Sequence, residues 1–230
     1  VLNATPTTGG KTIITAEADI NAANTGIDAA NTRKGTTGLE INATNITTTA
    51  PSASGVNNVG IQAMNMGVGD EKITVTGLIT ATGDGINAQN FGQTSPTGVV
   101  STAKLTITAN EIKEGENGID TDNILSQGDV ASTLTGDIVA GSTGILSKDS
   151  GKGSNTTIIA KNISANLDGI NAQQGDGDLT ITANDITSSA NNGGSAYTNT
   201  LSAGVGGDVN ITTTGTVTAG VVGISVKNGY

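Results

Sequence analysis

The fold of this chain is decided by the stretch LTITANEIKEGENGIDT, which runs from Leu105 to Thr121. Its first residues alternate apolar and polar side chains, which is the two-residue period of a β-strand with one buried face. A lone aliphatic residue, Ile112, follows, and after five intervening residues the motif Gly118-Ile119, with a polar and then a small residue, closes the stretch. The same three segments recur along the chain, so the sequence predicts an internal repeat.

The Gly-Ile motif marks the period of this repeat. Clear copies begin at Gly26, Gly60, Gly85, Gly118, Gly144, Gly169 and Gly223, and a degraded copy begins at Gly193. The base period is about 25 residues, and insertions lengthen some repeats. Five residues separate the lone aliphatic residue from the next motif in six repeats, whereas six follow Ile186 and thirteen follow Ile46. A spacing this constant indicates two strands joined by a corner, and a disordered polar chain has no reason to keep it.

Each repeat therefore predicts three short strands separated by three corners, which is one rung of a three-sided coil. One rung cannot bury its aliphatic residues, but stacked rungs bury them against their neighbours. We predict an all-β fold, a parallel β-helix (β-solenoid) of about eight rungs that forms a single domain over residues 1–230. With rungs about 4.8 Å apart, the rod would be about 40 Å long.

The corners carry their own pattern. We expect the glycine of each Gly-Ile motif to adopt a positive φ, which glycine does at little cost. Two residues beyond the small residue of the motif, an asparagine recurs at Asn31, Asn65, Asn90, Asn123 and Asn228. Asparagine closes turns through side-chain hydrogen bonds, and stacked copies can bond to one another. The sequence thus predicts a structural asparagine ladder along one corner.

The composition bounds both the core and the function. Only 1% of the residues are aromatic, so the core must be thin and aliphatic. The chain has no Cys, which excludes disulfides, zinc-thiolate sites and a cysteine nucleophile. The net charge is −10 and Arg33 is the one arginine, which argues against nucleic-acid partners and against charge-driven binding to anionic lipid.

No apolar run approaches the length of a membrane span, so we expect no direct membrane insertion. The first residues lack the features of a signal peptide, and we expect any export signal to lie outside this stretch.

Catalytic chemistry finds little support in the sequence. The chain has no His, which removes Ser-His-Asp triads and the commonest general base. The nearest candidates for a glycosidase carboxylate pair are Asp70 with Glu71 and Asp176 with Asp178, but both pairs lie in glycine-rich corners where we expect solvated turn residues. We predict no catalytic, cofactor-binding or metal-binding residues, and a carbohydrate-active β-helix enzyme remains the least favoured alternative.

Two further alternatives rest on short motifs. The run from Gly175 to Asp178 has some likeness to calcium-binding nonapeptides, but it occurs once and lacks their full pattern. Thr-x-Thr pairs, such as Thr106 with Thr108 and Thr180 with Thr182, are found on ice-binding faces, but other rungs interrupt the series. Threonine on strand faces is ordinary β-propensity, and a turn and a sheet surface explain these residues.

A family resemblance comes from runs such as LTITANDI, Leu179 to Ile186, combined with the Gly-Ile motif. These repeats resemble the passenger repeats of bacterial type V autotransporters, especially large adhesin-like ones, over nearly the whole chain. Similar rungs recur in related secreted β-helices, including filamentous haemagglutinins. The resemblance implies a right-handed helix, export through the outer membrane to the cell surface or the medium, and a C-terminal translocating β-barrel in the full-length chain. This chain would then be a fragment of a longer passenger.

The most variable segments follow the Gly-Ile strand: residues 32–38, 66–72, 91–104, 124–131, 150–155, 175–178 and 199–208. In a solenoid they fall on one edge, where they can form a continuous binding patch. The residues that we predict to contact a partner are Phe91, Gln93, Thr94, Arg33, Lys34 and Tyr197. The expected function is non-enzymatic binding to a host cell-surface protein or to extracellular matrix. The alternative is a released passenger that acts as a soluble effector on a host receptor.

Overall fold

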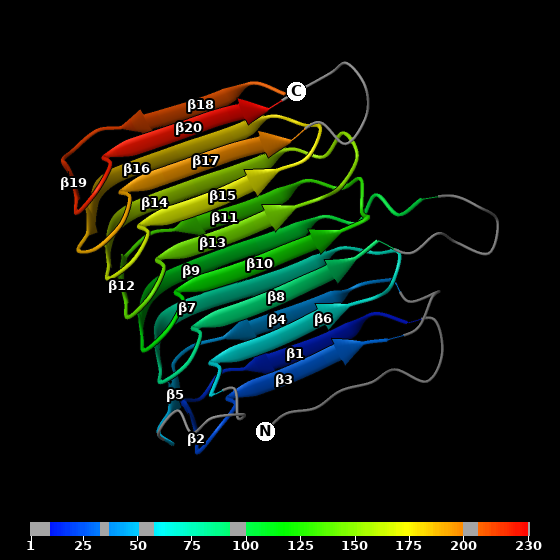
Figure 1. Cartoon of the computed structure of the whole chain (residues 1–230). Helices are drawn as coiled ribbons and strands as arrows, with labels where there is room; N and C mark the ends of the chain where they lie inside the picture. Colours follow the sequence, from blue (N-terminus) through cyan, green and yellow to red (C-terminus); the bar gives the residue numbers. More distant parts are fainter. Residues whose placement is uncertain (1–9, 33–36, 51–57, 93–99, 200–206, 230) are drawn as a thin grey trace.

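The structure is a computed structural model that describes residues 10–32, 37–50, 58–92, 100–199 and 207–229. These residues form twenty β-strands in two parallel sheets, and they contain no helix. The described part of the chain accordingly offers no helix that could cross a membrane. The predicted all-β class and the parallel β-solenoid are confirmed (Figure 1).

The strands form eight rungs, and each rung contributes to three faces. The first face consists of β1 (Thr12–Ala16), β4 (Leu39–Ala43), β7 (Glu71–Ala81), β9 (Leu105–Glu114), β11 (Val130–Leu134), β14 (Thr156–Ala165), β16 (Leu179–Ser188) and β18 (Val209–Thr213). The second face consists of the later parts of β7, β9, β14 and β16, together with β2 (Ile20–Ala22), β5 (Ile46–Thr48), β12 (Asp137–Ala140) and β19 (Val217–Ala219). The third face consists of β3 (Ile27–Asn31), β6 (Ile61–Asn65), β8 (Ile86–Phe91), β10 (Ile119–Ile124), β13 (Ile145–Asp149), β15 (Ile170–Gln174), β17 (Gly194–Asn199) and β20 (Ile224–Gly229).

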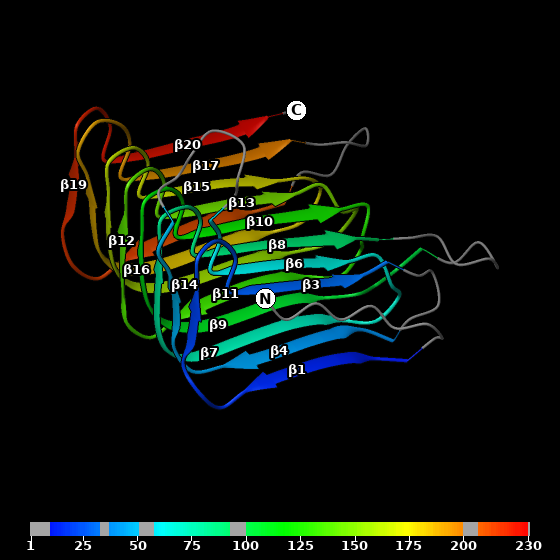
Figure 2. The ribbon, with the colours of Figure 1, turned by 90° about the horizontal axis from the view of Figure 1, so that it is seen from below.

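The coil is right-handed. Seen from the N-terminal end in Figure 2, the third-face strands run to the right along the top, and the first-face strands return to the left along the bottom. The chain therefore turns clockwise as it moves away from the viewer, and Figure 1 shows the same sense. Right-handed crossovers between parallel strands are the rule because twisted strands pack back onto their sheet in that sense.

Three isoleucine-rich columns of inward residues lie in the core, one behind each face, and the first face adds a column that contains Leu39, Leu105 and Leu179. The first column contains Ile14, Ile41, Ile73, Ile107, Ser132, Ile158, Ile181 and Ile211. The second contains Ile20, Ile46, Ile79, Ile112, Ile138, Ile163, Ile186 and Val217, which are the lone aliphatic residues of the repeat. The third contains Ile27, Ile61, Ile86, Ile119, Ile145, Ile170, Gly194 and Ile224. Each fully buried isoleucine contributes about 1.5–3 kcal/mol.

The motif glycine is required for a reason other than its φ. Positive φ occurs among the described glycines only at Gly38 and Gly153, so the predicted positive φ of the Gly-Ile motif is wrong. A Cβ on Gly60 would lie 2.6 Å from Ile79 Cγ2, and one on Gly144 would lie 2.3 Å from Ile163 Cγ2. The glycine therefore makes room for the lone aliphatic residue of the next rung.

The register of the third rung places a charged residue in the core. Ile73 lies opposite Ile41, and Glu71 lies opposite Leu39. Glu71 therefore carries a charged side-chain type at a position that faces the core. The backbone register follows the column of isoleucines, and the carboxyl group is carried inward with it.

Candidate functional site

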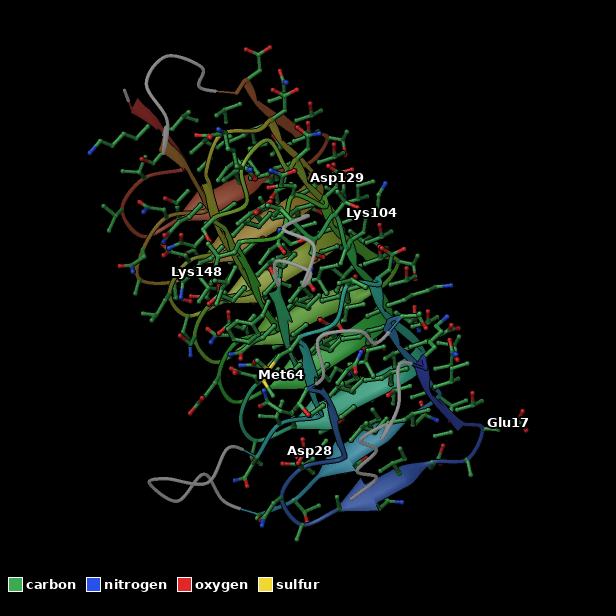
Figure 3. The ribbon with its side chains drawn as sticks, turned by 90° about the vertical axis from the view of Figure 1, so that its right-hand side faces the viewer. Glu17, Asp28, Met64, Lys104, Asp129 and Lys148 are labelled. Carbon is green, nitrogen blue, oxygen red and sulfur yellow. The ribbon has the colours of Figure 1, made fainter. Side chains whose placement is uncertain are left out.

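The segments that join the third face to the first all leave the ends of third-face strands, so they share one edge of the rod. Figure 1 shows this edge, here called the loop edge, on the right, and Figure 3 views it directly. For the described residues of these segments, the predicted gathering on one edge is confirmed. In Figure 3 the labelled Met64 and Lys148 lie on the third-face side, and Lys104 and Asp129, an ion pair at 3.5 Å, lie on the first-face side.

A ladder of buried amides supports the loop edge from inside. Asn31 donates to Asn65 at 3.0 Å, Asn65 to Asn90 at 3.3 Å, and Asn90 to Asn123 at 3.0 Å, each bond running from Nδ2 to Oδ1. All four side chains are fully buried. The amides also donate to carbonyl groups of the corner segments, as Asn90 does to Ala103 at 2.9 Å. The predicted ladder is confirmed for these residues, and the side chain of Asn228 lies outside the described part.

The ladder ends at a carboxylate. Asn123 Nδ2 donates to Asp149 Oδ1 at 2.9 Å, and the same oxygen accepts from the Gly151 amide at 2.9 Å and Ser154 Oγ at 2.8 Å. Asp149 Oδ2 accepts from Thr156 Oγ1 at 3.2 Å. Burial raises the pKa of Asp149, and these hydrogen bonds oppose the rise. The carboxylate therefore closes the series of donors and fixes the corner that follows β13.

Glu71 is the opposite case. Its side chain is fully buried in the core between Leu39 and Leu105, and neither carboxyl oxygen has a hydrogen-bond partner among the described residues. Burial raises the pKa of Glu71 well above its ordinary value. The expectation that Asp70 and Glu71 are both solvated is therefore wrong for Glu71, while Asp70 is exposed. One carboxyl points into the core and the other to solvent, so the two do not form a catalytic pair.

The predicted contact residues are only partly placed. Phe91 is the last residue of β8 and pairs with Ile124, so it belongs to a strand and not to a loop, and its side chain is half-buried on the outer surface. Tyr197 lies in β17 and pairs with Gln173 and Lys227, and only its backbone is described. The remaining predicted residues lie outside the described part of the chain: Arg33, Lys34, Gln93 and Thr94.

Sequence reasoning missed the most prominent side chain of this edge, Leu125. It follows β10, it is 68% exposed, and it has a φ of 62°, the one positive φ among the non-glycine residues that the structure describes. Such a conformation costs about 1–3 kcal/mol for a residue of this type. The corresponding position of neighbouring rungs is occupied by Gly67, Gly92 and Gly151. A leucine where three other repeats have glycine was the signal in the sequence.

The backbone beyond Leu125 is held by buried hydrogen bonds. Ser126 is fully buried, and its Oγ donates to Ala103 O at 2.8 Å and accepts from the Gly128 amide at 3.2 Å. The Gln127 amide donates to Ser101 O at 2.8 Å. Because these bonds anchor the corner to the preceding rung, Leu125 stands out from the edge on a rigid support. Half-buried Phe91 and Ile124 lie on adjacent rungs beside it.

These features define a class of protein by architecture: a right-handed parallel β-solenoid with an amide ladder under its loop edge and exposed apolar side chains upon it. Comparison with protein-family models, with curated proteins and with solved structures yields no match to this chain. Within the described residues no group of three or more His, Cys, Asp and Glu side chains is arranged to hold a metal ion.

Proposed function

We propose that this chain is a non-enzymatic passenger segment of the bacterial type V autotransporter kind, secreted or displayed on the cell surface, which binds a host cell-surface protein or extracellular matrix. The observation that carries the proposal is Leu125, an exposed leucine held in a strained backbone conformation by buried hydrogen bonds. Backbone strain that the surrounding structure maintains is typical of functional sites.

The surroundings of Leu125 support a role in binding macromolecules. Interfaces are anchored by a few large side chains, and a backbone that is held in place before binding lowers the entropy that binding costs. Leu125, Phe91 and Ile124 are apolar residues at adjacent positions of the edge that also carries the insertion between β8 and β9. A stack of rungs with a continuous aliphatic core provides a stiff support for this edge.

The chemistry of the side chains favours binding over catalysis. The sequence contains no His, and the carboxyl groups of Asp70 and Glu71 are separated by the sheet surface. The resemblance of the repeats to autotransporter passengers points to an extracellular partner. The carboxyl groups of the ladder and of the core are closed to a substrate, because Asp149 is buried and accepts hydrogen bonds and Glu71 is enclosed.

The proposal is tested by binding of the purified chain to cultured host epithelial cells and to surfaces coated with matrix proteins. We expect saturable binding that falls at least about tenfold on Leu125→Gly, which removes the side chain and relieves the positive φ. Replacing residues 93–99 by a short Gly-Ser linker should also weaken binding while leaving β8 and the buried Ala103 in place.

The matched control is Ile159→Thr. Ile159 is a 43% exposed aliphatic residue on the outer surface of β14, where its neighbours in register are Thr133 and Thr182. It tests whether any exposed aliphatic side chain has the same effect. Absence of binding by the unmodified chain, or equal loss in the control, would contradict the proposal.

A further inference from the structure

Two carboxylates lie on the same outer surface as the apolar group of the loop edge. Along β10 the outward positions are Asp120, Asp122 and Ile124, and Leu125 follows. Successive outward side chains of a strand are about 7 Å apart. The row therefore changes from acidic to apolar over about 14 Å of one strand, ending at the exposed leucine. We call these four residues the β10 row.

The acidic half of the row has two carboxylates but one cation in register on the flanking strands, Lys148 opposite Asp122. On the flanking strands the outward neighbours are neutral Asn87 and Gln89 on one side and Leu146 and Lys148 on the other. Neither Asp120 nor Asp122 forms an ion pair within the described residues. Burial and the negative charge of Asp84 raise the pKa of Asp120 to about 6, and burial raises the pKa of Asp122. Lys148 offsets only part of these effects.

We propose that the β10 row is the docking surface for an extended polypeptide segment of the partner, with Lys or Arg side chains against Asp120 and Asp122 and a large apolar side chain against Ile124 and Leu125. This inference rests on the proposed function and names the chemistry of the partner. In an extended segment, every second side chain points to the same side, at the same spacing as the side chains of the β10 row. The basic and apolar residues that contact the row would therefore be separated by residues that face away from it.

Charge complementarity selects this occupant over others. A cation placed at the row would be attracted by both carboxylates and by a chain whose net charge is −10. Nucleic acid and anionic lipid would be repelled by the same charges. The apolar end needs a large side chain, since Leu125 is exposed while Phe91 and Ile124 leave part of their surface open beside it.

The probe is a synthetic heptapeptide of sequence KTKTLTL with blocked ends, and two control peptides replace its Lys residues by Glu or its Leu residues by Ser. Fluorescence anisotropy measures binding to the purified chain. We expect the probe to bind at least about tenfold more tightly than either control. The double variant Asp120→Asn with Asp122→Asn, and separately Leu125→Gly, should each lose about tenfold, whereas Ile159→Thr should bind like the unmodified chain.

Circular dichroism of each variant verifies that the solenoid is retained. The inference is overturned if the probe shows no preference over its controls, or if the β10-row variants bind it as the unmodified chain does. It is also overturned if cells or matrix bind the unmodified chain and the β10-row variants equally. Binding of the probe in the expected manner by a chain that attaches to no cell or matrix would instead refute the proposed function and leave the docking surface standing.

Discussion

The amide ladder and Glu71 are both polar and both buried, yet the solenoid treats them in opposite ways. Asn65 and Asn90 each have an asparagine in the rung before and in the rung after, so each amide donor meets an amide oxygen at 3.0–3.3 Å. Glu71 has Leu39 and Leu105 as its neighbours in register, and its oxygens meet no donor in the described structure. A polar group inside a solenoid is stable when the repeat supplies a partner in the next rung. A buried polar group without such a partner lowers the free energy of unfolding.

Interrupting the ladder should have the largest effect. Asn123→Leu removes the acceptor of Asn90, the donor to Asp149 and the donor to Gly128 O, and each buried group left unpaired costs about 1–3 kcal/mol. We expect a loss of about 3 kcal/mol or more in the free energy of unfolding, measured by urea denaturation. The control Asn87→Leu lies on the outer surface of β8 and should change stability by less than about 1 kcal/mol. Similar losses in both variants would show that the ladder is no more important than a surface amide.

Removing the isolated carboxyl should have the next largest effect, in the opposite direction. Glu71→Leu restores the aliphatic column and eliminates two unpartnered oxygens, so we expect a gain of about 1–3 kcal/mol at pH 7. Glu71→Gln is the matched control, because it keeps unpartnered polar atoms but cannot ionise. A stability of Glu71→Leu at or below that of the unmodified chain would mean that the carboxyl is satisfied.

The same pair of variants gives a pH test. Because burial raises the pKa of Glu71 above its ordinary value of 4.5, the folded state binds the proton more tightly than the unfolded state. The stabilisation from this proton is complete below about pH 4.5 and is lost as the pH rises through the folded pKa. The unmodified chain should therefore lose stability with rising pH relative to Glu71→Gln. A constant difference from acid to neutral pH would contradict this expectation.

The smallest effect is expected where a carboxylate already has partners. Asp149→Asn keeps an acceptor for Asn123, and its new amide lies beside Thr156 Oγ1, so stability at pH 7 should change by about 1 kcal/mol or less. The pKa of Asp149 is also raised by burial, so the unmodified chain should lose a little stability relative to this variant as the pH rises. A loss in urea denaturation as large as that of Asn123→Leu would show that the negative charge itself is needed at the end of the ladder.

Much of the fold can be predicted from the sequence because the residues of each core column recur at regular intervals along the chain. The isoleucine of the lone segment recurs before the motif glycine, and in the folded chain it lies against the motif glycine of the preceding rung. The recurring asparagines were found in the same way, and their ladder follows from stacking in register. The sequence places Phe91 in a loop, because an insertion follows it directly and no repeat signal marks the last residue of a strand.

The chain's residue pattern was sufficient to set the strands, the three faces and the eight rungs, because each depends on contacts that every repeat makes in the same way. The inward direction of Glu71 and the strained, exposed conformation of Leu125 required the folded molecule. Both residues depart from the repeat, and their positions follow from the register that the neighbouring rungs impose on them. Where a residue agrees with its repeat, local sequence carries the information, and where it disagrees, the stacked rungs decide its environment.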